Sequence, residues 1–378
     1  METGPQDALL GRAMAALRRG DIKAARAGFE SLPRPPWMLL AKACNDCGDM
    51  PGLEHALSRQ LAIEPRNLAA LLGMGELKAR QGDERSATSF FQAAIAHVAG
   101  RPVPPGIAAQ VERARVFVNG AAARFEQQLL GRLDHAALLQ GDSHRRFRHA
   151  IDLLLGKVPV YQQQPTKFYF PELPQRTFYE REEFAWLAPM EAAAGAMTQE
   201  LRQVMDRGVA FPPYVEGDAD RPAQDTHLRG NADWGAFHFW KDGQVVHPNA
   251  DLCPATMAAL AHAPMPDIAG RSPMALWSLL KPGTHIPPHH GMLNTHLICH
   301  IPLIVPGACA LRVGHETRPW RAGETLVFDD SIEHEAWNRS NETRVILLFE
   351  IWRPEITPEE RSALAQLFAA IDDFGQAS

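Results

Sequence analysis

The last third of the chain gathers histidines in short stretches that could together bind a metal ion. These stretches contain His285, His289 and His290, then His296 and His300, and finally His334. His334 follows His289 by 45 residues, which is too far for two ligands on one helix and excludes a helical zinc-protease motif. Neutral imidazoles from separate elements, with open positions opposite them, suit a non-haem iron(II) oxygenase. The spacing also fits a cupin-type metal- or sugar-binding barrel, so both kinds of site remain open.

Arg344 follows His334 by ten residues, which places it on the next expected strand. A guanidinium that points into a barrel can donate two parallel, charge-assisted hydrogen bonds to a carboxylate. If the histidines bind iron(II), this arginine suits the distal carboxylate of 2-oxoglutarate.

Short apolar runs separated by glycine and proline predict β-strands after about residue 228. The runs are Ala275–Leu280, Leu297–Val305, Leu311–Val313, Thr325–Phe328 and Val345–Ile351. Several short strands at this spacing are typical of a sandwich or a double-sheet barrel. Such a barrel can bring one histidine from the loop after an early strand and another from a late strand.

Residues 7–100 follow a helical pattern in which the dipeptide Gly-Asp recurs, at residues 20–21, 48–49 and 82–83. The last interval is 34 residues, the period of tetratricopeptide repeats, whereas the first interval is 28. Ala25 and Phe29 follow the first pair at the same offsets as Ala87 and Phe91 follow the third. The pattern predicts two or three degenerate tetratricopeptide-like repeats, with an ordinary antiparallel helix bundle as the alternative.

Composition and charge exclude several classes of protein. The net charge of −6 argues against a nucleic-acid surface, and 46% hydrophobic with 22% charged residues is ordinary for a globular chain. No window approaches the roughly 18 apolar residues of a spanning helix, and no signal peptide is evident. The five cysteines are scattered, and Cys44 and Cys47 lack a second ligand pair. We therefore expect a cytoplasmic protein that binds neither nucleic acid nor a membrane.

Three motifs in the C-terminal part are specific enough to suggest a family. They are Leu280–His285, Glu350–Glu355 and the segment Phe328–Trp337, which reads Phe-Asp-Asp-Ser-x-Glu-His-Glu-x-Trp. With these motifs, and a looser aromatic block that begins at Trp234, residues 165–360 resemble the aspartyl/asparaginyl β-hydroxylases. The resemblance implies a double-stranded β-helix that requires iron(II) and 2-oxoglutarate.

The resemblance also implies roles for the histidines. His289 and His334 match the two metal ligands of the family. The two histidines beside the first ligand, His285 and His290, are expected to be loop residues that do not bind the metal.

Most 2-oxoglutarate oxygenases carry an acidic ligand two residues after the first histidine, and here that position is Gly291. The β-hydroxylases share this absence and fill the third position with water. Asp330 matches a residue near that water, where it would accept a hydrogen bond and support the catalytic centre.

For the cosubstrate, Ser278 and Arg344 match the groups that hold the distal carboxylate of 2-oxoglutarate, and His300 matches the histidine near its C1 carboxylate. The chain departs from the family at His296, where members usually have an arginine, and some have another at the position of Ile298. In the animal enzymes these arginines help to bind acidic groups of the substrate. A histidine is shorter and only partly charged near neutrality, which opens the choice of substrate.

Together these observations predict an α+β chain in three parts. Residues 1–100 form tetratricopeptide-like helical repeats, residues 101–160 a helical extension, and residues 161–378 a jelly-roll or cupin-like oxygenase domain. The expected activity is hydroxylation of an unactivated C–H bond, first of all the β-carbon of Asp or Asn in a peptide or protein. The alternatives are a free amino acid, lipid or other small molecule with the same cofactors, and a non-catalytic scaffold. The repeats would offer a groove to a protein partner.

Overall fold

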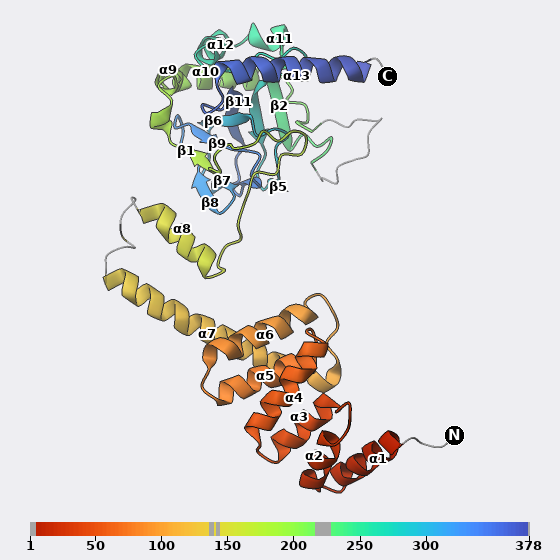
Figure 1. The fold of residues 1–378 in the computed structure, drawn as a ribbon. Helices are drawn as coiled ribbons and strands as arrows, with labels where there is room; N and C mark the ends of the chain where they lie inside the picture. Colours follow the sequence, from red (N-terminus) through yellow and green to blue (C-terminus); the bar gives the residue numbers. More distant parts are fainter. Residues whose placement is uncertain (1–4, 136–139, 141–143, 216–227, 377–378) are drawn as a thin grey trace. The chain divides into compact units, whose positions relative to one another are not determined.

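The computed structural model describes residues 5–135, 140, 144–215 and 228–376. The chain forms two compact units, residues 1–157 and 158–378 (Figure 1). The first unit is helical and the second combines β-sheets with helices, which confirms the predicted α+β class. Residues 136–139 and 141–143 of the predicted helical extension lie outside the described residues.

The first unit consists of helices whose sequential neighbours pack as antiparallel pairs. Its elements are α1 (Pro5–Arg18), α2 (Ile22–Glu30), α3 (Trp37–Asp46), α4 (Met50–Ile63), α5 (Leu68–Arg80), α6 (Glu84–Val98), the 3-10 helix η1 (Pro105–Ile107), α7 (Ala108–His135) and α8 (Arg145–Leu154). The strongest contacts join α1 with α2, α3 with α4, and α5 with α6. The helical-repeat prediction is thus confirmed as three helix pairs, while the tetratricopeptide assignment stays a prediction.

Each Gly-Asp dipeptide forms the turn inside one helix pair. The glycines adopt the left-handed conformation, with φ between 76° and 80°, which ends the first helix. The aspartate then caps the second helix by accepting a hydrogen bond from the N–H three residues on: Asp21 from Ala24, Asp49 from Gly52 and Asp83 from Ser86. The dipeptide therefore recurs because one residue stops a helix and the next starts another.

The second unit contains eleven described strands, together with helices on one side of the larger sheet (Figure 1). The strands are β1 (Phe178–Tyr179), β2 (Trp234–Lys241), β3 (Gln244–Val245), β4 (Ala275–Leu280), β5 (His285–His289), β6 (His296–Ile304), β7 (Cys309–Val313), β8 (Glu316–Pro319), β9 (Leu326–Phe328), β10 (His334–Asn338) and β11 (Arg344–Trp352). The helices are η3 (Arg181–Glu183), α9 (Leu187–Ala192), α10 (Ala194–Asp206), α11 (His247–Ala250), α12 (Pro254–Leu260) and α13 (Pro358–Gln376).

The strands form two antiparallel sheets. The larger sheet has the order β1-β9-β6-β11-β4-β2-β3, and the smaller has the order β5-β10-β7-β8. An apolar core fills the space between the sheets, and it includes Ile298 and Ile346 from the large sheet and Leu311 and Ala336 from the small one. A second core lies on the other face of the large sheet, against α9, α10 and α12. The predicted double-sheet barrel is therefore confirmed.

Alternation along the central strand β11 decides which side chains face the barrel interior. Val345, Leu347 and Phe349 belong to the helix-covered core, whereas Ile346 and Leu348 belong to the core between the sheets. Because successive side chains of a strand point to opposite faces, Arg344 and Glu350 face the interior as well. The five predicted strand runs correspond to β4, β6, β7, β9 and β11. No helix in the described parts of the chain is long and apolar enough to cross a membrane.

Candidate functional site

The two predicted metal ligands lie side by side on the small sheet. His289 ends β5, His334 begins β10, and the two residues are directly paired in the antiparallel register. Their ring centroids are 4.1 Å apart, with an angle of 51° between the ring planes. Although His334 follows His289 by 45 residues in sequence, the two rings are close enough to share one ion.

Both rings are oriented by the same kind of hydrogen bond. Nδ1 of His289 contacts the carbonyl oxygen of Pro287 at 2.8 Å, and Nδ1 of His334 contacts that of Ile332 at 3.1 Å. A carbonyl only accepts, so each Nδ1 carries the proton and donates, which leaves Nε2 with a lone pair. This is the usual support for a metal-binding histidine.

Burial keeps both imidazoles neutral. It lowers the pKa of His289, and burial together with the neighbouring His289 ring lowers the pKa of His334 to about 3. Neutral rings can offer a lone pair to a cation at physiological pH. The chemistry of the pair therefore fits a divalent metal ion.

Asp330 occupies the space that an acidic side chain at position 291 would need. A Cβ on Gly291 would lie 2.1 Å from Oδ2 of Asp330 and 2.8 Å from its Oδ1. The Gly291 N–H also donates to the Asp330 carbonyl oxygen at 2.7 Å. Burial, followed by the nearby carboxylates of Asp329 and Glu350, raises the pKa of Asp330 well above its usual range. The chain thus replaces a carboxylate at position 291 by one that reaches the same place from the other loop.

Arg344 is buried without an acidic partner. Its exposed fraction is 1%, and no described carboxylate forms an ion pair with it. One guanidinium nitrogen donates to the carbonyl oxygen of Ser278 at 3.3 Å, while Nε has no partner among the described residues. Burial lowers the pKa of Arg344 to about 9, which leaves it charged at neutral pH. A buried, uncompensated cation of this kind is a site prepared for an anion.

Ser278, on β4, lies beside this arginine and is held by an aromatic residue. The Trp234 indole N–H donates to the Ser278 hydroxyl oxygen at 3.2 Å, and Tyr214 stacks on Trp234 at a centroid distance of 4.2 Å. Since the hydroxyl accepts from the indole, its own proton remains available for a carboxylate.

His300, on β6, is 94% buried, and its Nδ1 has no hydrogen-bond partner in the described part of the structure. Burial, then the positive charge of Arg344 and the nearby His334, lowers its pKa well below the usual value. A neutral imidazole with an unused nitrogen beside a buried cation can contact an anionic ligand that the cation binds.

A closed series of neighbours joins these residues into one site. Arg344 lies over Trp320 at 4.8 Å, Trp320 is 5.9 Å from His300, and His300 is 4.8 Å from Phe328. Phe328 lies 5.7 Å from His334, whose partner His289 is 6.5 Å from Trp234, the donor to Ser278. The histidine pair and the arginine, which come from different sheets, therefore belong to the same ring of side chains.

One histidine differs from its expected position, and another has a partner that the sequence did not predict. His285 is not a loop residue, because it begins β5, where its Nε2 contacts Glu335 at 2.7 Å. His296 is buried, and its Nδ1 contacts the Glu350 carboxylate at 3.1 Å. His296 is therefore part of an internal pair rather than a free basic group.

Sequence reasoning missed Glu350, Trp234 as a support for Ser278, and Tyr214. Glu350 could have been found, because it lies six residues after Arg344 on one strand and therefore on the same face. Trp234 belongs to the aromatic block that the sequence already singled out. Tyr214 comes from an irregular segment, where no periodicity reports which way a side chain points.

In the described part of the chain no group of three or more His, Cys, Asp or Glu side chains could hold a metal ion. The candidate centre therefore rests on the pair His289 and His334, with the Asp330 carboxylate against Gly291.

Comparison with known proteins points to one family. Residues 191–354 match the family model described as aspartyl/asparaginyl beta-hydroxylase. The human aspartyl/asparaginyl beta-hydroxylase is 32% identical over 185 residues, which cover 47% of this chain and 24% of the human protein. The ornithine lipid ester-linked acyl 2-hydroxylase of Rhizobium tropici is 33% identical over 183 residues, or 48% of this chain and 62% of that protein. The chain thus spans less than two thirds of either relative.

Among solved structures, a Cupin 2 conserved barrel domain protein from Salinispora arenicola aligns with 41% of this chain and 98% of its own. The sequence identity is 17% and the TM-score 0.23.

Proposed function

We propose that the second unit, whose residues 191–354 match the aspartyl/asparaginyl β-hydroxylase family model, is an iron(II)- and 2-oxoglutarate-dependent oxygenase. The observation that carries this proposal is Arg344, a buried guanidinium without an acidic partner in the ring of side chains that contains the neutral pair His289 and His334. A pair of metal-binding histidines alone would also fit a cupin-type barrel with a different function. A prepared anion site beside the pair fits a ketoacid cosubstrate.

His289 and His334 would hold the iron through Nε2, since Nδ1 of each ring donates to a backbone carbonyl. When bound, iron(II) would let dioxygen oxidise an unactivated C–H bond to an alcohol, while 2-oxoglutarate gives the other two electrons and leaves as succinate and carbon dioxide. Asp330 lies next to Gly291, where it can bind a water that fills the third position. The protein contributes neutral ligands, a fixed geometry and a dry interior.

Arg344 would bind the distal carboxylate of 2-oxoglutarate, with the free Ser278 proton as a further donor and His300 near the other end. The guanidinium already uses one nitrogen on the Ser278 carbonyl, which fixes its plane. The remaining donors, including the unpartnered Nε, are available for the ligand.

The affinity for 2-oxoglutarate should fall as the pH rises above about 9. Only protonated Arg344 binds the carboxylate, and burial lowers its pKa to about 9 in the free protein. The bound anion favours the charged form, so binding takes up a proton above that pKa. We expect a nearly constant Kd from pH 7 to 8 and about a tenfold rise per unit well above pH 9. Calorimetry without oxygen, with the protein metal-loaded, measures this; a flat profile to pH 10 would contradict it.

For the substrate, the family relationship supports the β-carbon of Asp or Asn in a peptide or protein, which the helical repeats of the first unit would help to bind. A second candidate is a free amino acid, a lipid acyl chain or another small molecule. The pair between His296 and Glu350 favours it, because the position where relatives carry a substrate-binding arginine is here engaged with a carboxylate. The relative named as an acyl 2-hydroxylase also supports it.

Mass spectrometry can separate the two candidates. The protein would be incubated with iron(II), 2-oxoglutarate and one substrate at a time. The substrates are a peptide that contains Asp and Asn, its Ala-substituted copy, free amino acids and an amide-linked acyl lipid. One added oxygen on Asp or Asn, absent from the Ala copy, supports the first candidate. Oxygen added only to a free amino acid or to the acyl chain of the lipid supports the second candidate. Neither product nor succinate with any substrate counts against the proposed oxygenase.

A further inference from the structure

A segment ahead of the β-barrel, residues 163–170, contacts both loops that carry the proposed metal site. We call this segment the strap. Its Gln164 N–H donates to the Ser331 carbonyl oxygen at 2.7 Å, in the loop before His334. Its Thr166 N–H donates to the Gly291 carbonyl oxygen at 2.9 Å, in the loop after His289. The strap lies outside residues 191–354, the part that matches the family.

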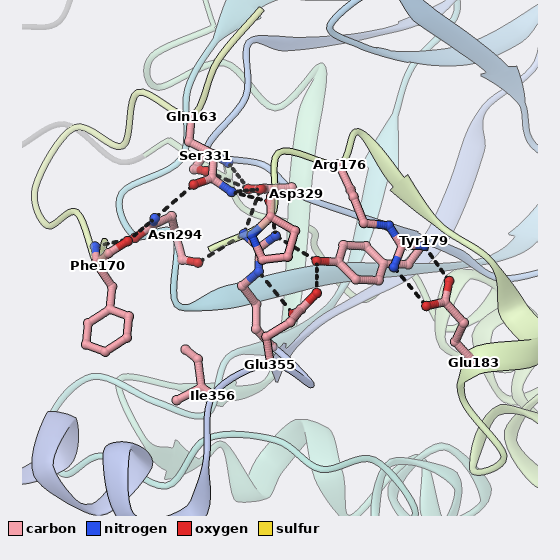
Figure 2. A network of polar contacts seen from close by, with 12 residues as sticks. Gln163, Phe170, Arg176, Tyr179, Glu183, Asn294, Asp329, Ser331, Glu355 and Ile356 are labelled. Atoms are coloured by element: carbon pink, nitrogen blue, oxygen red, sulfur yellow. Dashed lines mark hydrogen bonds and ion pairs between the residues drawn. The ribbon is translucent and has the colours of Figure 1, made fainter. Parts of the chain in front are cut away.

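Within the strap, the Gln163 side chain joins the two loops directly. Its amide nitrogen donates to Oδ2 of Asp329 at 2.7 Å, and its amide oxygen accepts from Asn294 Nδ2 at 3.0 Å. Figure 2 shows Gln163 with dashed contacts to Asn294 on one side and Asp329 on the other. The side chain is 94% buried, so water cannot easily replace these bonds.

The Gln163 amide nitrogen also donates to the Pro174 carbonyl oxygen at 3.0 Å. The other two partners, Asp329 and Asn294, belong to loops whose shape sets the histidine geometry. Asp329 accepts from the Ser331 N–H and hydroxyl, which fixes the turn whose Ile332 carbonyl orients the His334 ring. Asn294 follows His289 by five residues and is anchored on Phe170, with an N–H···O bond in each direction. Gln163 therefore adds a side-chain link between the two loops, beside the Gly291–Asp330 backbone bond and Arg353, which contacts both Asn294 and Asp329.

The partners would remain bonded without Gln163. Asp329 still pairs with Arg353 at 2.7 Å, a bridge in which both side chains are fully buried. Asn294 still donates to the Phe170 carbonyl oxygen at 2.8 Å. Loss of the Gln163 amide should therefore disturb the spacing of the loops more than the stability of the unit.

We propose that Gln163 is a positioning residue for the metal site, acting on His289 and His334 through the two loops. This proposal rests on the proposed function. It predicts that metal binding depends on a side chain outside the matched family region, and that this dependence exceeds the effect on folding.

Three consecutive glutamines provide a matched test. Gln162 and Gln164 are exposed, whereas Gln163 is buried. Q162M and Q164M therefore make the same chemical change as Q163M without removing the contacts of Gln163 to Asn294 and Asp329. In the full-length protein, Co²⁺ binding is followed by calorimetry and by the visible spectrum of the bound ion. Loss of a supporting hydrogen bond costs about 10–100-fold in metal affinity. We expect a loss of that size and a changed spectrum for Q163M, and wild-type values for both controls.

A second variant approaches the same contact from its other end. N294D keeps an acceptor for the Phe170 N–H but loses the donations to Gln163 and to the Phe170 carbonyl oxygen. Because both changes break the bond between Gln163 and Asn294, the loss of Co²⁺ affinity in the double variant should be smaller than the product of the two single losses. If Q163M does not fold, N294D alone carries the comparison with the controls.

Wild-type Co²⁺ affinity and spectrum in Q163M, with only a lower unfolding temperature, would make Gln163 merely structural and overturn the proposal. Equal losses in Q162M and Q164M would overturn it too. If wild-type protein binds no Co²⁺, the proposed function itself fails, and the positioning role fails with it.

Discussion

Replacement of His334 by alanine should abolish the conversion of 2-oxoglutarate to succinate. The ring is one of two neutral imidazoles that would hold the iron, and its neighbour His289 cannot hold the ion alone with comparable affinity. Removal of a residue that only supports a metal ligand lowers activity by up to about 100-fold, and we expect a larger loss of activity for H334A. Succinate formation per mole of purified protein, with iron(II) added in excess, measures the effect.

The matched control is H290A, which removes a histidine beside the pair. His290 is expected to face away from the metal, so this variant should keep most of the activity and the metal content. Folding of each variant is compared by thermal unfolding. Equal succinate formation by H334A and the wild type would refute the proposed mechanism.

Replacement of Arg344 by methionine should remove most of the affinity for 2-oxoglutarate while it spares or raises stability. Breaking one partner of a buried charged contact costs about 2–5 kcal/mol, which corresponds to roughly 30-fold to several thousand-fold in Kd. In the free protein the guanidinium has no acidic partner, so its removal relieves a buried charge. The Kd for 2-oxoglutarate and the unfolding temperature are the two readouts.

Arg353 is the contrasting case, because it is equally buried but pairs with Asp329. Removal of one member of such a pair costs about 3–5 kcal/mol of folding stability. R353M should therefore unfold at a clearly lower temperature than R344M. A large loss of stability in R344M with an unchanged Kd would show that Arg344 is structural and not part of a cosubstrate site.

The sequence predicted the barrel because its strands are short, apolar and separated by turn residues. It predicted the helix pairs because Gly-Asp both ends and starts a helix, which the φ angles and the capping bonds show directly. The histidine pair could be anticipated only through the family motifs, since no local pattern states that β5 and β10 pair so that His289 faces His334.

Tertiary contacts explain what the sequence could not provide. The position of the Asp330 carboxylate against Gly291 depends on how two loops pack that are 39 residues apart in sequence. The contact between His296 and Glu350 depends on the pairing of two adjacent strands. Gln-Gln-Gln carries no periodicity that would mark Gln163 as buried. Such contacts follow from how the loops pack, not from the composition of any one segment.

One site in the barrel should bind iron(II) and 2-oxoglutarate together. The most direct test is an anaerobic titration of the protein with iron(II) in the presence of 2-oxoglutarate, followed by visible absorbance. We predict a charge-transfer band that saturates at one iron per chain in the wild type and is absent from H334A. No band in folded wild-type protein, or an identical band in H334A, would show that the two histidines and the arginine do not form such a site.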